Sequence, residues 1–398
     1  MVSVTRVQDA HEGITAIWAS ALIDGTGAEP QRDVLLTLDE GKLSRVEAGG
    51  KPAGMNMAVL DLREYTVLPG LINMHTHTVL PGNGTPFAQW MELPDELLLL
   101  QAHTNALNAL HSGVTTIRDC GGKGTLMFQL RDAIRRGIVP GPRFVLSGRP
   151  LTITGGHCRY FGGEVDGVDE MRLAARQLLK EGADFIKIMA SGGGTVGTYS
   201  QYPAFDVDEM RAAIHEAHKI GKRASCHCIA QGSIANALDA GTDHIEHCSF
   251  MAPDTTQHYD EQLAQRVASQ GVYVTPTLQV MRKGRMGEGN ISVIRNLHEL
   301  GVPLVAGNDA GWLSTGFGDF YRELQCLEEC GLTPLEAIHA ATGRAADACQ
   351  LSGVVGIVAP GCIADLLVVK GDPTSDLGVL ADPLMVLQAG KVIVDRRY

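Results

Sequence analysis

The 398-residue chain lacks an excess of positive charge, since 33 Lys and Arg residues face 45 Asp and Glu residues, for a formal net charge of −12. It has no Lys/Arg-rich run, and binding to nucleic-acid phosphates needs concentrated positive charge. No apolar run reaches membrane-spanning length, and the first residues show no basic segment followed by an apolar one, the pattern of a secretory signal. These absences argue against a nucleic-acid or membrane partner, and we expect a cytoplasmic protein.

The chain also lacks the regular cysteine pattern of a disulfide-rich secreted domain. Its nine cysteines, an odd number, lie in apolar stretches such as "RASCHCIA" and "HIEHCSF". We expect them to be reduced, small buried side chains. With 44% hydrophobic and 20% charged residues, the composition is that of a soluble globular protein.

A repeated pattern occupies the middle of the chain: a short apolar run, then small or polar residues, then a helical stretch. The helical stretches 166–183 and 206–222 each begin with Asp, a preferred N-cap residue, and end near Gly. Eight strands alternating with helices fit a (β/α)₈ TIM barrel, an α/β fold of usually ~250 residues, although a doubly wound open sheet would share the alternation. The polar residues at the C-terminal ends of different strands favour the barrel. The predicted strands are 66–77, 114–119, 143–148, 185–190, 223–228, 244–249, 272–278 and 303–309.

Both flanks of this region are rich in short strands separated by Gly and Asp turns. We expect them to form one small β-sandwich. The predicted domains are therefore 1–65, the N-terminal part of the sandwich; 66–352, the barrel; and 353–398, the C-terminal part of the sandwich.

Side chains that can bind metal ions or transfer protons recur at the ends of the predicted barrel strands. His75 and His77 in "GLINMHTHTVL" face the same side of an extended backbone, because alternate strand residues do so. In a TIM barrel these strand ends converge on one mouth. His244, three residues from His247, should face the opposite side and is better explained as a core residue. The gathered candidates are His75, His77, Lys187, His227, His247 and Asp309.

Each candidate alone has a structural explanation: a strand histidine is more often a hydrogen-bonded core residue, and a strand-end aspartate is often a cap. Lys187 is the hardest to explain in this way, because a buried ammonium without a partner is costly. Imidazole and carboxylate suit Zn²⁺ and related ions. If carbon dioxide adds to a neutral Lys187, the resulting N6-carboxylated lysine offers two oxygens that can bridge two metal ions.

The order of these residues resembles the binuclear amidohydrolase superfamily. The segments "VLPGLINMHTH", "GVTTIRDCGG", "TGGHC", "GADFIKIMASGG", "AGTDHIEHCSF" and "VPLVAGNDAG" are similar to its prolidase-like branch, which includes Xaa-Pro and Xaa-Arg/Lys dipeptidases and ochratoxin-hydrolysing amidases. The resemblance spans nearly the whole chain. Because members of this family often form homo-oligomers, it also implies a homo-oligomer.

The resemblance also implies roles for these residues. His75, His77 and Asp309 would hold the more buried metal ion, and His227 and His247 the more exposed one. Carboxylated Lys187 and a hydroxide would bridge the two ions. The hydroxide would attack an amide carbonyl, and Asp309 would act as general acid/base.

Further residues concern the substrate, expected to be a small-molecule amide. The resemblance implies that His157 touches it. Arg159 could receive a carboxylate bidentately, and Tyr199 or Tyr202 in a glycine-rich stretch could contact it. Where several relatives carry a carboxylate-binding tyrosine, this chain has Phe205, which cannot donate that hydrogen bond.

The sequence therefore predicts hydrolysis of an amide C–N bond, in a dipeptide, an N-acyl amino acid or an aryl amide. Carbamate, phenylurea or cyclic-amide hydrolysis at the same site is an alternative. A mononuclear deaminase, which needs no strand lysine, is another. A non-catalytic scaffold is disfavoured because buried histidines and a lysine without partners would destabilise it. The sequence offers no account of Asn308, which stands where relatives usually have threonine.

Overall fold

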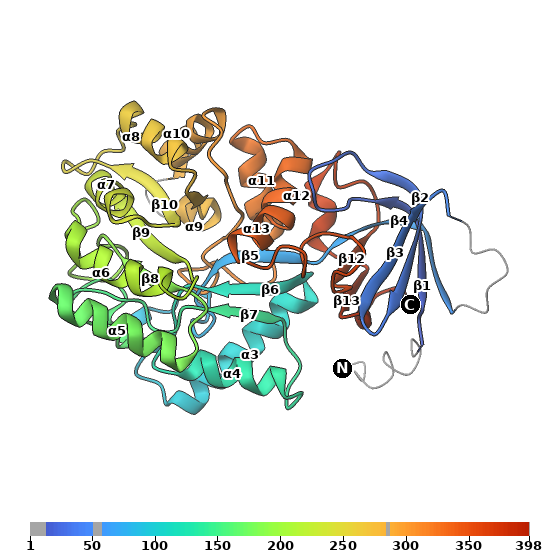
Figure 1. Cartoon of the computed structure of the whole chain (residues 1–398), viewed down its shortest axis with the longest axis horizontal. Helices are drawn as coiled ribbons and strands as arrows, with labels where there is room; N and C mark the ends of the chain where they lie inside the picture. Colours follow the sequence, from blue (N-terminus) through green and yellow to red (C-terminus); the bar gives the residue numbers. More distant parts are fainter. Residues whose placement is uncertain (1–12, 51–57, 284–286, 398) are drawn as a thin grey trace.

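The computed structural model describes residues 13–50, 58–283 and 287–397 of the chain. Figure 1 shows a strand-rich end beside a larger part in which helices surround shorter strands. The prediction that the N-terminus carries no secretory signal concerns residues 1–12, which lie outside the described residues.

One seven-stranded sheet combines strands from both ends of the chain, in the order β14-β13-β12-β4-β1-β2-β3. β12 pairs antiparallel with the end of β4, so that Leu366 lies opposite Pro69. Ile17, Leu36 and Leu62 belong to the buried core of this sheet. A second packed sheet, which the predicted β-sandwich requires, is not found among the described residues. The strands are β1 (Ala16–Leu22), β2 (Gln31–Asp39), β3 (Lys42–Ala48), β4 (Val59–Pro69), β12 (Leu366–Val369), β13 (Met385–Gln388) and β14 (Lys391–Asp395).

Seven of the eight predicted central strands form two parallel sheets. The three-stranded sheet has the order β5-β6-β7, and the four-stranded sheet has the order β11-β10-β9-β8. Every strand pair in both sheets is parallel, as expected where helices connect successive strands. The strands are β5 (Leu71–Thr76), β6 (Val114–Asp119), β7 (Arg143–Leu146), β8 (Ile186–Met189), β9 (Ala224–Ala230), β10 (His244–Met251) and β11 (Tyr273–Thr275).

The eighth predicted strand, 303–309, makes only isolated parallel bridges, Val274 with Leu304 and Thr76 with Ala310. A third isolated bridge joins Leu151, which follows β7, to Ile188 of β8. The sheets thus meet at both edges, but the described residues do not form the continuous closed ladder of the predicted barrel. Pro303 has no N–H to donate to a ladder. A Cβ at Gly307 would lie 2.7 Å from the backbone nitrogen of His75, so the chain here passes unusually close to β5.

Helices follow the central strands and cover them (Figure 1). The two predicted Asp N-caps differ. Asp206 begins α6 with a capping box, whereas Asp166 precedes α5 but accepts from Thr154 instead of capping. Gly182 ends α5 as predicted, while α6 ends at Lys219 before the glycine. The α-helices are α2 (Phe87–Trp90), α3 (Asp95–His111), α4 (Leu126–Arg135), α5 (Gly167–Glu181), α6 (Val207–His218), α7 (Gln231–Ala240), α8 (Glu261–Ser269), α9 (Leu278–Lys283), α10 (Gly287–Glu299), α11 (Tyr321–Glu329), α12 (Pro334–Ala340) and α13 (Gly343–Ala348).

Two short 3₁₀ helices complete the fold, η1 (Arg159–Phe161) and η2 (Leu377–Ala381). Within the described residues, no helix combines the length and the apolar character that crossing a membrane requires. All nine cysteines are free, and eight of them are buried, in agreement with the expected reduced, apolar role.

Candidate metal and catalytic site

His75 and His77, at the end of β5, point toward one carboxylate. The Nε2 atoms of both rings lie 3.5 Å from Asp309 Oδ1. The same aspartate donates its backbone N–H to the carbonyl oxygen of His75 at 2.9 Å. Alternation along the strand thus aims both imidazoles at one point, as the sequence predicts.

The opposite nitrogen of each of these rings is already bonded. His75 Nδ1 lies 2.7 Å from Glu246 Oε2, and His77 Nδ1 lies 2.9 Å from the carbonyl oxygen of Gly121. A carbonyl oxygen can only accept, so His77 carries its proton on Nδ1. The Nε2 atoms that face Asp309 are therefore free to act as electron-pair donors.

His227 and His247 lie beside this pair. Their ring centroids are 4.5 Å apart, and the ring of His247 lies 5.1 Å from that of His75. His227 uses Nε2 to donate to the carbonyl oxygen of Gly192, and His247 Nδ1 lies 2.7 Å from Thr277 Oγ1. One nitrogen of each ring therefore remains available, and the four imidazoles form a single buried cluster.

Lys187 and Asp309 bring two unsatisfied polar atoms to this cluster. Lys187 is 0% exposed, and neither its Nζ nor Asp309 Oδ1 has a hydrogen-bond partner. A buried polar atom without a partner costs stability. An unpartnered carboxylate oxygen fits a positively charged group such as a metal ion, and Lys187 Nζ can contact such a group only in a neutral form, because an ammonium repels a cation.

Burial controls protonation in the cluster. It lowers the pKa of His77 to about 4 and holds the pKa values of His75, His227 and His247 well below the ordinary value. The charge of Lys187 lowers all four pKa values further. The imidazoles are thus neutral at pH 7, the form that binds metal ions. Burial raises the pKa of Asp309 to about 7, an effect that the charge of Lys187 opposes.

In the part of the chain that the structure describes, two groups of closely spaced donor atoms could hold an ion, and both contain His75. One adds His247 and Asp309; the other adds Cys120 and Glu246. Burial raises the pKa of the Cys120 thiol to about 12, so this thiol is not a thiolate at neutral pH. The first group, whose Asp309 Oδ1 lacks a partner, fits an ion better.

The sequence comparisons agree with this geometry. Residues 66–393 match the model of the Amidohydrolase family. The chain belongs to the amidohydrolase family.

Individual relatives place it in the prolidase-like branch of the superfamily. Ochratoxinase of Aspergillus niger is 27% identical over 434 residues, covering 95% of this chain and 85% of the relative. A Xaa-Pro dipeptidase crystallised with bound methionine superposes with a TM-score of 0.87 at 28% identity, covering 95% of this chain and 98% of the other. A prolidase complexed with N-methylphosphonate-L-proline gives a TM-score of 0.86 at 27% identity, over 96% and 99% of the two chains.

This amidohydrolase is therefore an enzyme that hydrolyses an amide C–N bond. The deaminase, carbamate, phenylurea and cyclic-amide alternatives are not favoured. Amidohydrolases are generally metal-dependent, and the donor groups around His75 are the candidate ligands in this chain.

Glu246 is the residue at this site that sequence analysis missed. It is fully buried on β10, where its carboxylate contacts Arg118 at 2.7 Å as well as His75. Such a carboxylate fixes the orientation and the tautomer of the imidazole that it contacts. An acidic residue inside the buried strand "HIEHCS" was the signal that could have revealed it.

The structure shows the contacts of two residues that the sequence analysis placed outside the proposed ligands, His244 and Asn308. His244 is buried and its Nε2 lies 2.6 Å from Thr275 Oγ1, as expected of a core histidine outside the cluster. The side chain of Asn308 accepts from Asn73 Nδ2 at 2.8 Å and donates to Gln279 Oε1 at 2.9 Å. Asn308 thus ties the segment that carries Asp309 to β5 and α9.

The cluster opens into a pocket of about 380 Å³, in the lower part of the ~300–1,000 Å³ range of ligand sites. His157 lines this pocket, and its ring centroid lies 4.6 Å from that of His227. Arg159 does not line it, because its guanidinium stacks on the Tyr160 ring and donates to that hydroxyl at 2.7 Å.

The predicted aromatic residues lie elsewhere. Tyr199 and Tyr202 are exposed and do not line this pocket, which Ser200 reaches instead. Phe205 is buried in the main hydrophobic core rather than in the pocket wall. The glycines of this loop allow close packing: a Cβ at Gly193 would meet the His157 ring at 2.5 Å.

Proposed function

We propose that this amidohydrolase hydrolyses its amide with two divalent metal ions, Zn²⁺ by the chemistry of the donors, held by the histidine cluster. His75, His77 and Asp309 would hold one ion, and His227 and His247 the other. Lys187, carboxylated on Nζ, would supply oxygens to both. The observation that supports this assignment most strongly is the pair of buried atoms without partners, Lys187 Nζ and Asp309 Oδ1, among neutral imidazoles.

The protein's own groups account for the proton transfers. When bound, two such ions polarise a carbonyl and lower the pKa of a water molecule. Asp309 Oδ1, which has no hydrogen-bond partner, would take the proton of the attacking water and deliver it to the leaving nitrogen. Glu246 keeps His75 oriented throughout, because it contacts Nδ1.

The proposed substrate classes are dipeptides, N-acyl amino acids and aryl amides, with His157 contacting the bound molecule from the pocket wall. We also propose that 66–352 form one domain of the (β/α)₈ type and that 1–65 and 353–398 together form a second, strand-rich domain, as the seven-stranded sheet with strands from both ends of the chain supports. The enzyme would act in the cytoplasm as a homo-oligomer.

Metal analysis and turnover test this proposal together. Protein stripped with a chelator and reloaded with Zn²⁺ should retain two ions per chain and hydrolyse at least one amide of a panel of these classes. The variant Lys187→Met should bind less metal and lose this turnover. His244→Gln, which changes a buried histidine outside the cluster, is the matched control and should keep both ions.

Three outcomes would contradict parts of the proposal. If Lys187→Met keeps both ions, Lys187 does not bridge them. If nuclear magnetic resonance of active protein prepared with labelled bicarbonate shows no carbamate carbon, the carboxylation is wrong. If the metal-loaded protein cleaves no amide of the panel, these substrate classes are wrong.

A further inference from the structure

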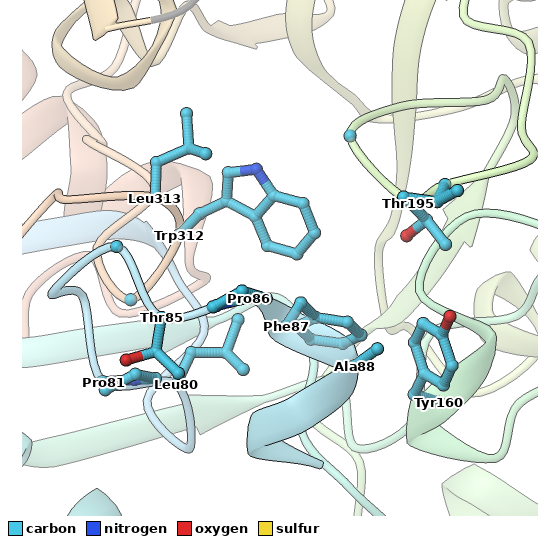
Figure 2. A pocket seen from close by; sticks show the side chains of 14 residues that line it. Leu80, Pro81, Thr85, Pro86, Phe87, Ala88, Tyr160, Thr195, Trp312 and Leu313 are labelled. Atoms are coloured by element: carbon cyan, nitrogen blue, oxygen red, sulfur yellow. The ribbon is translucent and has the colours of Figure 1, made fainter.

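A second, apolar pocket adjoins the one that contains the histidines. It has a volume of about 270 Å³ and shares Gly194, Trp312 and Leu313 with the histidine pocket. We call it the vestibule. Figure 2 shows the Trp312 indole projecting over Pro86 and Phe87, with Thr195 and Tyr160 on the other side of the space. Trp312 thus forms part of both pocket walls.

Aromatic rings connect the two spaces. The centroid of the Trp312 ring lies 5.5 Å from that of His157 and 5.1 Å from that of Phe87. The Tyr160 ring lies 5.1 Å from Phe87, and its hydroxyl already accepts from Arg159. The vestibule therefore offers ring faces and edges, which suit an apolar or aromatic group.

The histidine pocket also has an apolar wall. Ile229, Met251, Val280 and Met281 form a buried cluster there, against which Trp312 packs. Methionine side chains adapt to irregular apolar groups. A bound molecule thus meets hydrocarbon, sulfur and indole as well as the histidines.

Charged side chains are missing from these walls. Among the described residues that line either pocket, none is Lys or Arg, and the sole acidic residue is Asp309 of the proposed metal centre. Recognition of a substrate carboxylate favours a bidentate arginine or another cation. Burying a carboxylate beside this apolar wall without such a partner is costly.

We infer that the substrate is an uncharged amide with an apolar group on each side of the scissile bond. One group packs against the apolar wall of the histidine pocket, and the other occupies the vestibule, with Trp312 between them. This inference rests on the proposed function, since it places the amide carbonyl at the histidine cluster. It selects uncharged aryl or alkyl amides over dipeptides and N-acyl amino acids.

Binding of non-hydrolysable ligands tests the inference independently of turnover. The probes are 1,3-diphenylpropan-1-one, a ketone with the shape of N-benzylbenzamide, and the same ketone with a para-carboxylate on the ring distant from the carbonyl. Titration calorimetry with zinc-loaded protein should show the neutral ketone binding at least about tenfold more tightly, which corresponds to ~1.4 kcal/mol. Equal or tighter binding of the carboxylate, or binding of neither ketone, would overturn the inference.

A pair of variants in the apolar wall sharpens the test. Met281→Arg places a cation in this wall and should improve binding of the carboxylate ketone relative to the neutral one by about tenfold. Met281→Leu, which nearly conserves volume and adds no charge, should leave the wild-type preference in place. If the arginine variant, with a circular dichroism spectrum like that of wild type, shows no change in preference, the wall does not select charge.

Turnover separates failure of this inference from failure of the proposed function. N-benzylbenzamide and its para-carboxylate counterpart are incubated with the zinc-loaded enzyme, and kcat/KM is compared. Hydrolysis that favours the carboxylate overturns the inference and leaves the proposed function intact. Preferential binding of the neutral ketone without hydrolysis of either amide supports the inference about the pocket and counts against the proposed function.

Discussion

Asp309 is connected to His75 twice: its backbone N–H donates to the His75 carbonyl oxygen at 2.9 Å, and its Oδ1 lies 3.5 Å from His75 Nε2. The two residues are 234 positions apart in the sequence, yet the relation between them depends partly on the backbone. A change of the Asp309 side chain can therefore alter the chemistry of the site without releasing the segment that carries it.

Asp309→Asn should abolish most activity while the protein remains folded. The amide cannot accept and release the proton in transit, and removal of a general acid or base costs about 10²- to 10⁴-fold. The measurement is kcat/KM on any amide that the wild type cleaves, with thermal unfolding as the test of folding. A loss smaller than about tenfold would show that Asp309 does not transfer the proton.

Glu246→Gln should weaken metal binding without changing the volume of the pocket, which Glu246 does not line. Glu246 contacts His75 through one carboxylate oxygen and Arg118 through the other. Glutamine has a single oxygen and an NH₂ group that cannot accept, so it cannot make both contacts, and His75 loses its fixed orientation. Loss of such a contact typically costs about 10- to 100-fold in metal affinity. Competition with a zinc-binding dye measures this change.

The variant Glu216→Gln is the control for that measurement, because Glu216 bonds to Arg176 of α5 and to Lys219 at the end of α6 rather than at the site. It should leave zinc affinity unchanged. Wild-type affinity in Glu246→Gln would show that His75 needs no carboxylate partner.

Asn308→Ala should destabilise the fold. It leaves Asn73 Nδ2 and Gln279 Oε1 buried without the partner that Asn308 supplies, and each such loss costs about 1–3 kcal/mol. Urea unfolding measures the change. Asn108→Ala, at an exposed position of α3, is the control and should stay within about 0.5 kcal/mol of wild type.

Glu216 should make stability depend on acid pH. Hydrogen bonds from Arg176 and then Lys219 lower the pKa of Glu216 to about 2, below its ordinary value of 4.5. A carboxylate whose pKa is lower in the folded state stabilises the fold fully above the unfolded pKa, and this contribution is lost as pH falls from 4.5 toward 2.

Urea unfolding at a series of pH values measures this dependence, with Glu216→Gln as the comparison. The midpoint of the wild type should fall more between pH 6 and 3 than that of the variant, and solvent screening by the exposed Arg176 keeps the difference small. Parallel curves would contradict the assigned cause.

Local patterns were sufficient for much of the fold. Seven apolar runs could be predicted as strands because their apolar character and flanking glycines are local properties, and all seven form parallel strands. The segment 303–309 makes isolated bridges rather than a continuous strand, although its backbone bonds to both neighbouring strands, and Gly307 approaches His75 closely. That approach depends on a strand far away in the sequence.

The sequence by itself determined which side chains could donate electron pairs, and it placed them at strand ends, because strand alternation and residue type are written in each segment. Only the tertiary structure decided which nitrogen of each histidine is free, that Glu246 holds His75, and that Arg159 is engaged by Tyr160. Those facts depend on contacts between segments whose separation along the chain carries no information about their distance in space. Protonation follows the same rule, since burial by many distant residues keeps the imidazoles neutral.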